Sequence, residues 1–133
     1  IPADHSGSNR DVLITQKDVN EIMLAKGAIH AGLEILLAAT DTAPEEVAEV
    51  IIAGGFGSAL NIESALGMGL FPDLPNAQYR QVGNAAVLGA KWMLISHAAR
   101  QRAEKIAGGT VYNELTVYPQ FSRKFAMGML FPR

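Results

Sequence analysis

The chain has 133 residues, of which 49% are hydrophobic and 18% charged, so it is long and apolar enough to form one domain with a packed core. It contains no cysteine, which excludes a disulfide scaffold, a thiolate zinc site and an iron–sulfur cluster held by this segment. The 11 Lys and Arg residues against 13 Asp and Glu residues give a formal net charge of -2 without a basic block, so no nucleic-acid partner is expected.

The first residues are polar and rich in Ser, Gly and Asn, which predicts a flexible start or linker over residues 1–11 and one domain over residues 12–133. The sequence opens on Ile-Pro-Ala-Asp without an initiator Met, so we expect a fragment of a longer chain. We expect that the first residues do not form a signal peptide and that no apolar run is long enough to span a membrane. The short β-branched run Val12-Leu13-Ile14 resembles the end of a strand.

Apolar residues recur at helical spacing from Gln16 to about Ala39, with Thr15 as the N-terminal cap. They form a broad stripe and a narrower one, which is typical of a helix packed between layers. Gly27 and Gly32 each cost about 1 kcal/mol relative to Ala inside a helix, so we expect another backbone to approach there. Lys26 lies within the broad stripe. Either its ammonium reaches an anionic group of a ligand, or the side chain extends to solvent through a gap in the packing.

The strongest local signal is the apolar run Val50–Ala53 followed by Gly54-Gly55-Phe56-Gly57-Ser58. The run predicts a strand of a parallel sheet, buried on both faces. The glycines allow positive φ and a close approach of backbone to a ligand, at the edge of the sheet where such folds bind ligands. The spacing is neither the dinucleotide fingerprint nor a phosphate-binding Walker loop. An ordinary tight turn remains the alternative.

Strands that alternate with helices predict an α/β fold. In a helix beginning at Ala85, Ala86, Gly89 and Ala90 share one face, which favours tight packing against a neighbour. The remaining elements are expected as a short helix at Pro44, a helix from Asn61 to about Met68, a loop over residues 71–76, a strand over residues 79–82, a helix over residues 85–99, a strand over residues 110–117 and a short helix from Pro119.

The three histidines His5, His30 and His97 are far apart and have no neighbouring ligands at metal spacing, so no metal site is expected. No Ser–His–Asp arrangement is evident, and Ser58 is not in a nucleophile elbow. The sequence therefore identifies no catalytic residue.

Several motifs occur together, namely Leu13–Val19, Leu24–Ile29, Ile51–Ser58, Gly69–Asp73, Val82–Ala90, Tyr112–Leu115 and Phe131-Pro132. From about Val12 onward the chain resembles the C-terminal part of the reductive activators of corrinoid proteins. These are ATP-dependent iron–sulfur proteins of the superfamily of acetate and sugar kinases, heat-shock chaperones and actin. The resemblance implies a ribonuclease-H-like lobe of an actin-like ATPase, with a mixed sheet flanked by helices.

The resemblance also implies a set of contacts with ATP. The segment Gly54–Ser58 is similar to the adenosine motif of the superfamily, which contacts the nucleoside through its backbone. The helix from Gln16 to Lys26 is similar to the one that walls the adenine and ribose pocket, so Gln16, Lys17, Glu21 and Lys26 are expected to line it as a group. The helix over residues 84–90 is similar to the second connecting helix between the lobes.

In this family ATP hydrolysis supports the reduction of an inactive cobalt(II) corrinoid to cobalt(I), so that a methyltransferase cycle resumes. The implied partner is a corrinoid protein, the implied assembly a homodimer and the implied location the cytoplasm. The phosphate motifs, the Mg²⁺ ligands and the cysteines of the [2Fe–2S] cluster have no counterpart here, so the fragment alone is expected to be inactive. The alternatives are a lobe of another actin-like ATPase or kinase, such as a dehydratase activator, and a non-catalytic dimerisation lobe.

Overall fold

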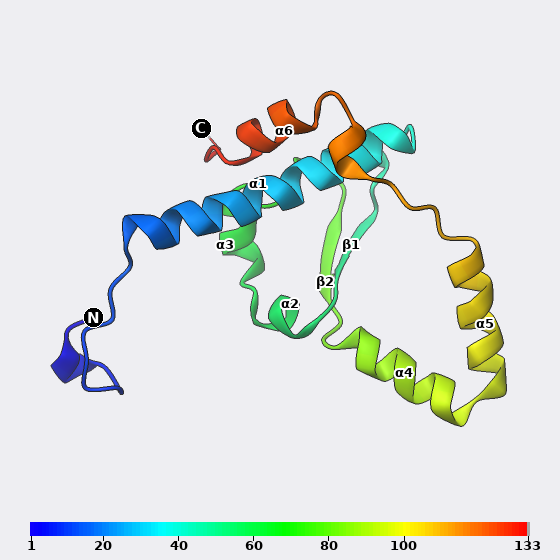
Figure 1. Cartoon of the computed structure of the whole chain (residues 1–133), viewed down its shortest axis with the longest axis horizontal. Helices are drawn as coiled ribbons and strands as arrows, with labels where there is room; N and C mark the ends of the chain where they lie inside the picture. Colours follow the sequence, from blue (N-terminus) through cyan, green and yellow to red (C-terminus); the bar gives the residue numbers. More distant parts are fainter. Residues whose placement is uncertain (133) are drawn as a thin grey trace.

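The computed structural model describes residues 1–132 and shows helices around a small parallel sheet (Figure 1). A long helix crosses the molecule, with the last helix on one side of it and the sheet on the other (Figure 1). In chain order the elements are η1 (Ala3–His5), α1 (Gln16–Ala39), η2 (Pro44–Glu46), β1 (Glu49–Ile52), α2 (Gly55–Ala59), α3 (Ile62–Gly67), β2 (Gln78–Gln81), α4 (Ala85–Ile95), α5 (His97–Gly108), η3 (Leu115–Val117) and α6 (Phe121–Gly128). The α/β prediction is confirmed.

Helix α1 begins where the sequence predicts, because Thr15 and Asp18 form a capping box. The amide of Asp18 donates to Thr15 Oγ1 (3.3 Å), and the amide of Thr15 donates to the Asp18 carboxylate (2.8 Å). The narrower apolar stripe is divided, because Ala31 and Ile35 are fully buried whereas Leu24 is 42% exposed. The broad stripe is only partly covered, with Ile22 50% and Ile29 42% exposed.

Helices α1 and α6 pack backbone to backbone at two glycines. A methyl group at Gly27 would lie 2.9 Å from the carbonyl oxygen of Phe125 and 2.7 Å from Met129 Cγ. A methyl group at Gly128 would lie 3.2 Å from the carbonyl oxygen of Gly27. The expected approach of another backbone is therefore confirmed at Gly27, whereas Gly32 faces the side chain of Leu115.

The sheet of the described residues is one parallel pair, in which Glu49 lies opposite Gln78 and Ile52 opposite Gln81. Both strands lie within one residue of the predicted ranges. The prediction that the first strand is buried on both faces is wrong, because Ile51 is 53% exposed while Val50 and Ile52 are partly buried. Within residues 1–132 one face of β1 therefore has no cover.

Three predicted elements differ from the structure. The expected helix over residues 85–99 is two helices, because Ser96 leaves the helical conformation (φ -137°, ψ 119°) and caps α5 by accepting a hydrogen bond from the amide of Ala99 (3.2 Å). The expected strand over residues 110–117 has no partner strand among the described residues. It is irregular until the 3₁₀ turn η3, and Val12–Ile14 is likewise not a strand.

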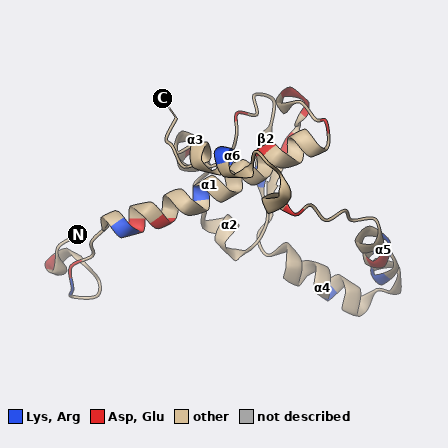
Figure 2. Ribbon diagram, turned by 45° about the horizontal axis from the view of Figure 1, so that its top comes forward, with Lys and Arg blue, Asp and Glu red and all other residues tan. Residues whose placement is uncertain are grey.

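Helices α4 and α5 extend away from the rest of the molecule as a pair (Figure 1). Helix α4 carries a single charged residue, Lys91, and its ribbon in Figure 2 is otherwise tan. Its apolar side chains nevertheless face solvent, with Leu94 81% and Ile95 75% exposed. The tight packing expected at Ala86, Gly89 and Ala90 is not present within residues 1–132, since a methyl group at Gly89 would meet no atom within 4 Å.

Helix α1 corrects one further expectation. An 18-residue window in it reaches a mean hydropathy of 1.6, so by length and composition alone this helix could cross a membrane. The core helices of folded domains satisfy the same criterion, and α1 packs against α6 in this structure.

The close packing at Gly27 generates a first prediction. Gly27→Ala should lower the free energy of unfolding by about 1–3 kcal/mol, because the new methyl group would overlap the backbone of α6. The matched control is Gly67→Ala in α3, where the methyl group meets nothing within 4 Å and should not be destabilising. Denaturant unfolding of both variants measures the difference, and equal stability would contradict the proposed overlap.

Candidate functional site

The glycine segment predicted as a ligand site forms a sharp turn from β1 into α2. Gly54 adopts a positive φ of 104°, and its amide donates to the carbonyl of Gly83 (2.7 Å). Gly57 lies where helix α2 folds back onto the strand, since a methyl group there would be 2.7 Å from Ile52 Cγ2. Two of the glycines are thus required by the fold of the turn itself.

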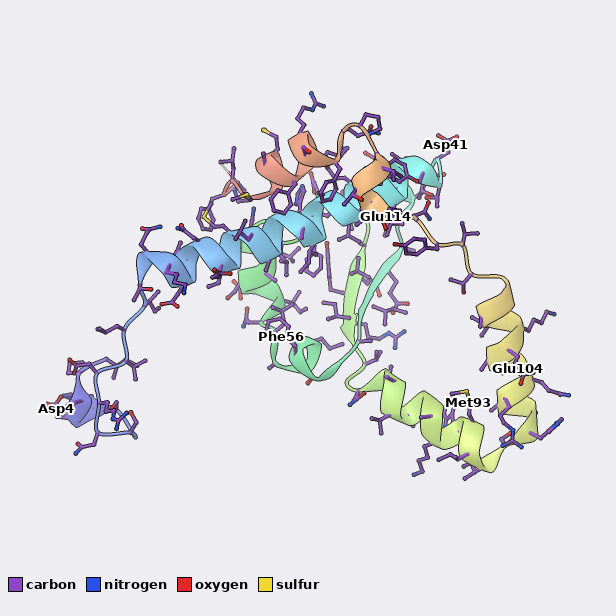
Figure 3. The ribbon with its side chains drawn as sticks, viewed as in Figure 1. Asp4, Asp41, Phe56, Met93, Glu104 and Glu114 are labelled. Carbon is purple, nitrogen blue, oxygen red and sulfur yellow. The ribbon has the colours of Figure 1, made fainter. Side chains whose placement is uncertain are left out.

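The outer side of the turn is open. A methyl group at Gly55 would meet nothing within 4 Å, and Phe56, labelled on α2 in Figure 3, is 84% exposed. The hydroxyl of Ser58 donates to the carbonyl of Gly55 (2.7 Å). The backbone at Gly55 is therefore accessible to another molecule, and the exposed ring of Phe56 provides an apolar surface beside it.

Gln81, at the end of β2, holds the inner side of the same turn. Its Nε2 donates to the carbonyls of Gly57 (2.5 Å) and Leu60 (2.7 Å), the latter being the C-terminal cap of α2. Sequence reasoning missed this residue. Gln81 is 24 positions from Gly57 in the sequence, and only the pairing of β2 with β1, which places Gln81 opposite Ile52, brings it beside the glycine turn.

The four residues of α1 that were expected to line the pocket as a group do not share one environment. Gln16, Lys17 and Glu21 lie on the exposed first turns of the helix, and Gln16 Nε2 donates to Asn20 Oδ1 (3.0 Å). These turns extend beyond the rest of the domain in Figure 1. Among the described residues, no hydrogen bond or ion pair joins them to the glycine turn.

Lys26 has a different environment from the other three. The residue is only 2% exposed, and its Nζ donates to the carbonyls of Gly128 (2.5 Å) and Leu130 (2.6 Å). The Phe131 ring centroid lies 5.9 Å from Nζ. This burial contradicts the expected extension to solvent. The ammonium instead binds carbonyls at the C-terminal end of α6, where the helix dipole is negative, and burial lowers the pKa of Lys26.

Lys26 also borders a cavity of about 930 Å³ between α1, the loop after α3 and the C-terminal tail, which is the segment 129–132 after α6. His30 Nδ1 donates to the carbonyl of Gly69 (3.1 Å) at the same place. A methyl group at Gly69 would lie 2.8 Å from Pro132 Cγ, so the absence of a side chain at Gly69 leaves room for Pro132. The glycine turn does not line the cavity, and the two sites are separate.

Within residues 1–132 no group of three or more His, Cys, Asp or Glu side chains is placed to hold a metal ion. The backbone of the glycine turn offers contacts to a nucleoside, whereas carboxylate ligands for Mg²⁺ are not gathered there. The residues at the turn therefore fit the nucleoside part of ATP, and those described do not form a site for its metal ion.

The chain is similar to known proteins along almost its whole length. Residues 1–133 match the family described as "C-terminal domain of RACo the ASKHA domain". The corrinoid activation enzyme RamQ of Eubacterium limosum is 31% identical over 131 residues, which cover 98% of this chain and 22% of that protein. A solved structure described as a reductive activator for corrinoid, iron–sulfur protein matches with a TM-score of 0.89 and 39% identity, over 98% of this chain and 21% of that one.

The buried ammonium generates a second prediction. Because burial lowers the pKa of Lys26 below its usual value of 10.5, the unfolded chain binds more protons than the folded chain between the two pKa values. The stability contributed by Lys26 should therefore rise as the pH increases from the folded pKa towards 10.5. The unfolding free energy of the wild type minus that of Lys26→Met should therefore increase with pH across this range. A constant or shrinking difference would contradict the burial of the charge.

Proposed function

The chain belongs to the family of C-terminal ASKHA domains of RACo, and we propose that it is the ATP-binding C-terminal lobe of a protein that reductively reactivates a corrinoid protein. The single observation that carries the proposal is the open glycine turn at the end of β1, found in a chain that matches this family along its whole length. The chain spans about a fifth of the length of the two relatives described above, so the activity belongs to the longer protein.

The residues of this chain would bind and orient the nucleoside. The backbone at Gly54 and Gly55 lies open beside the ring of Phe56, which offers a surface for an adenine or ribose ring. Gln81 fixes the turn from within through Gly57 and Leu60. The first turns of α1, with Gln16, Lys17 and Glu21, would close the pocket from another side.

The turn is also connected to α4. The Gly54 amide donates to the Gly83 carbonyl, and Gly83 directly precedes Asn84, whose side chain caps α4. A nucleotide that shifts the turn would therefore shift the base of α4. Such a displacement is how ATP would favour one of two arrangements of the protein, in which the bound corrinoid is more easily reduced.

Other parts of the longer protein would supply what this chain lacks. ATP would bind together with Mg²⁺, with the phosphate and metal contacts in the other lobe. The [2Fe–2S] cluster would be held by cysteines, of which this chain has none. The bare face of β1 at Ile51 and the apolar surface of α4 fit an interface with that other lobe. We further propose a homodimer located in the cytoplasm, with a corrinoid protein as partner.

The names of the two relatives favour corrinoid activation over a small-molecule kinase or a dehydratase activator. A non-catalytic dimerisation lobe would also explain exposed apolar residues. It would not explain why the outer side of the turn at Gly55 is open.

Gly55→Val tests the adenosine contact in the full-length protein. A Cβ at position 55 meets no atom of residues 1–132 within 4 Å, so we expect the variant to fold. It should weaken Mg-ATP and Mg-ADP binding at least about tenfold by crowding the nucleoside. Gly108→Val, on open space at the end of α5, is the matched control and should bind normally. Calorimetric titration measures both. Unchanged affinity in a folded Gly55→Val protein would remove the assignment.

Gly89→Leu tests the interlobe role of α4. A Cβ at position 89 meets no atom within 4 Å among residues 1–132, so we expect any loss to arise from a contact with another part of the protein. We expect a lower melting temperature of the full-length protein and slower ATP-dependent reduction of the corrinoid. Gly108→Leu serves as control at a second open glycine. If the Gly89→Leu protein behaves like wild type, α4 does not pack against the other lobe through this face.

A further inference from the structure

The cavity between α1, the loop over residues 69–77 and the tail is not used by the proposed nucleotide site. Its volume of about 930 Å³ lies in the range of small-molecule sites. The rings of Phe71 and Tyr79 lie against each other on one wall, with centroids 5.3 Å apart. The walls are mostly apolar and aromatic and include Leu66, Phe71, Leu74, Tyr79, Leu130 and Phe131.

The cavity is bordered by a buried positive charge that has no negative partner among residues 1–132. Among residues 1–132 no carboxylate lies within 4.0 Å of Lys26 Nζ, and the two groups that it binds are neutral carbonyls. The nearby acid on α1, Glu34, is already engaged, since its Oε2 accepts from Lys124 Nζ at 3.0 Å. A buried cation without an anion is costly, and the lowered pKa of Lys26 has the same origin.

We propose that this cavity binds a small apolar carboxylate. The hydrophobic body of the ligand packs against Phe71 and Tyr79, and its carboxylate accepts the N–H of Lys26 that the two carbonyls leave over, because an ammonium group has three donors. Phe131 lies over the ammonium but is 55% exposed, so its side chain can turn aside without disturbing the core. The proposal does not depend on the nucleotide site.

Asp73 also lines the cavity, and its negative charge would repel a carboxylate ligand. This acid is exposed to solvent and lies near Tyr79, where burial and the charge of Asp73 both raise the pKa of the phenol. Water and salt screen an exposed charge much more than a buried one. The attraction of Lys26 therefore exceeds the repulsion of Asp73, and the carboxylate binds beside Lys26.

The experiment compares three probes of one shape and different charge on the full-length protein: 3-phenylpropanoate, 3-phenylpropan-1-ol and 3-phenylpropylamine. Saturation-transfer NMR at millimolar concentration yields the dissociation constants. The carboxylate should bind at least about tenfold more tightly than the alcohol, and the amine least. Lys26→Met should bring the carboxylate to the affinity of the alcohol, whereas Lys105→Met, on the exposed helix α5 away from the cavity, should leave the affinity of the carboxylate unchanged.

Phe71→Ala provides a second variant in case Lys26→Met does not fold. It removes part of the apolar wall and should weaken the acid and the alcohol by the same factor. Equal binding of acid and alcohol to the wild type, preferential binding of the amine, or no binding of any probe would overturn the proposal. So would a Phe71→Ala protein that binds the acid as the wild type does, because the ligand would then lie elsewhere.

Discussion

The contact between α1 and α6 at Gly27 and Gly128 is the constraint on which much of the structure depends. It brings the tail to α1 across a sequence separation of about 100 residues, close enough for Lys26 to bind the carbonyls of Gly128 and Leu130. Neither glycine tolerates a side chain without displacing a neighbouring backbone. The tail, once held, forms one wall of the cavity beside Lys26. A short helix at the end of the chain thereby decides the environment of a lysine near its beginning.

A single backbone hydrogen bond has a comparable role at the other end of the sheet. The bond from Gly54 to Gly83 joins the two segments that follow β1 and β2, so the glycine turn and the base of α4 cannot move independently. Parallel strands place their carboxyl ends at the same edge, which explains why residues 29 positions apart meet there. The glycine turn and the apolar helix α4 are therefore connected through the carboxyl ends of the two strands.

Much of this fold could be predicted from local signals. The cap at Thr15, the glycine turn and the asparagine caps of α3 and α4 are short-range features, and the structure reproduces them. The errors arose where long-range contacts decide. Residues 110–117 have strand-like alternation but no partner strand among the described residues. The sequence predicts that the ammonium of Lys26 contacts either a ligand or solvent. In the structure its acceptors are carbonyls of Gly128 and Leu130, more than 100 residues away in the sequence.

Helix α4 shows why the lobe requires another surface. Leu94 and Ile95 are each at least three-quarters exposed, and the helix bears one charge, so neither of its sides is suited to water. Helix propensity alone does not explain the apolar residues of α4, because Lys, Glu and Gln favour the helical conformation about equally well. The small residues Ala86 and Gly89 favour close approach of a second backbone, just as Gly27 and Gly128 do at the contact that is present. Small residues thus permit the close contact between α1 and α6 within this chain, and we infer that they permit a second one between α4 and the remainder of the protein. Burial of α4 would then link the glycine turn to whatever lies across the interface.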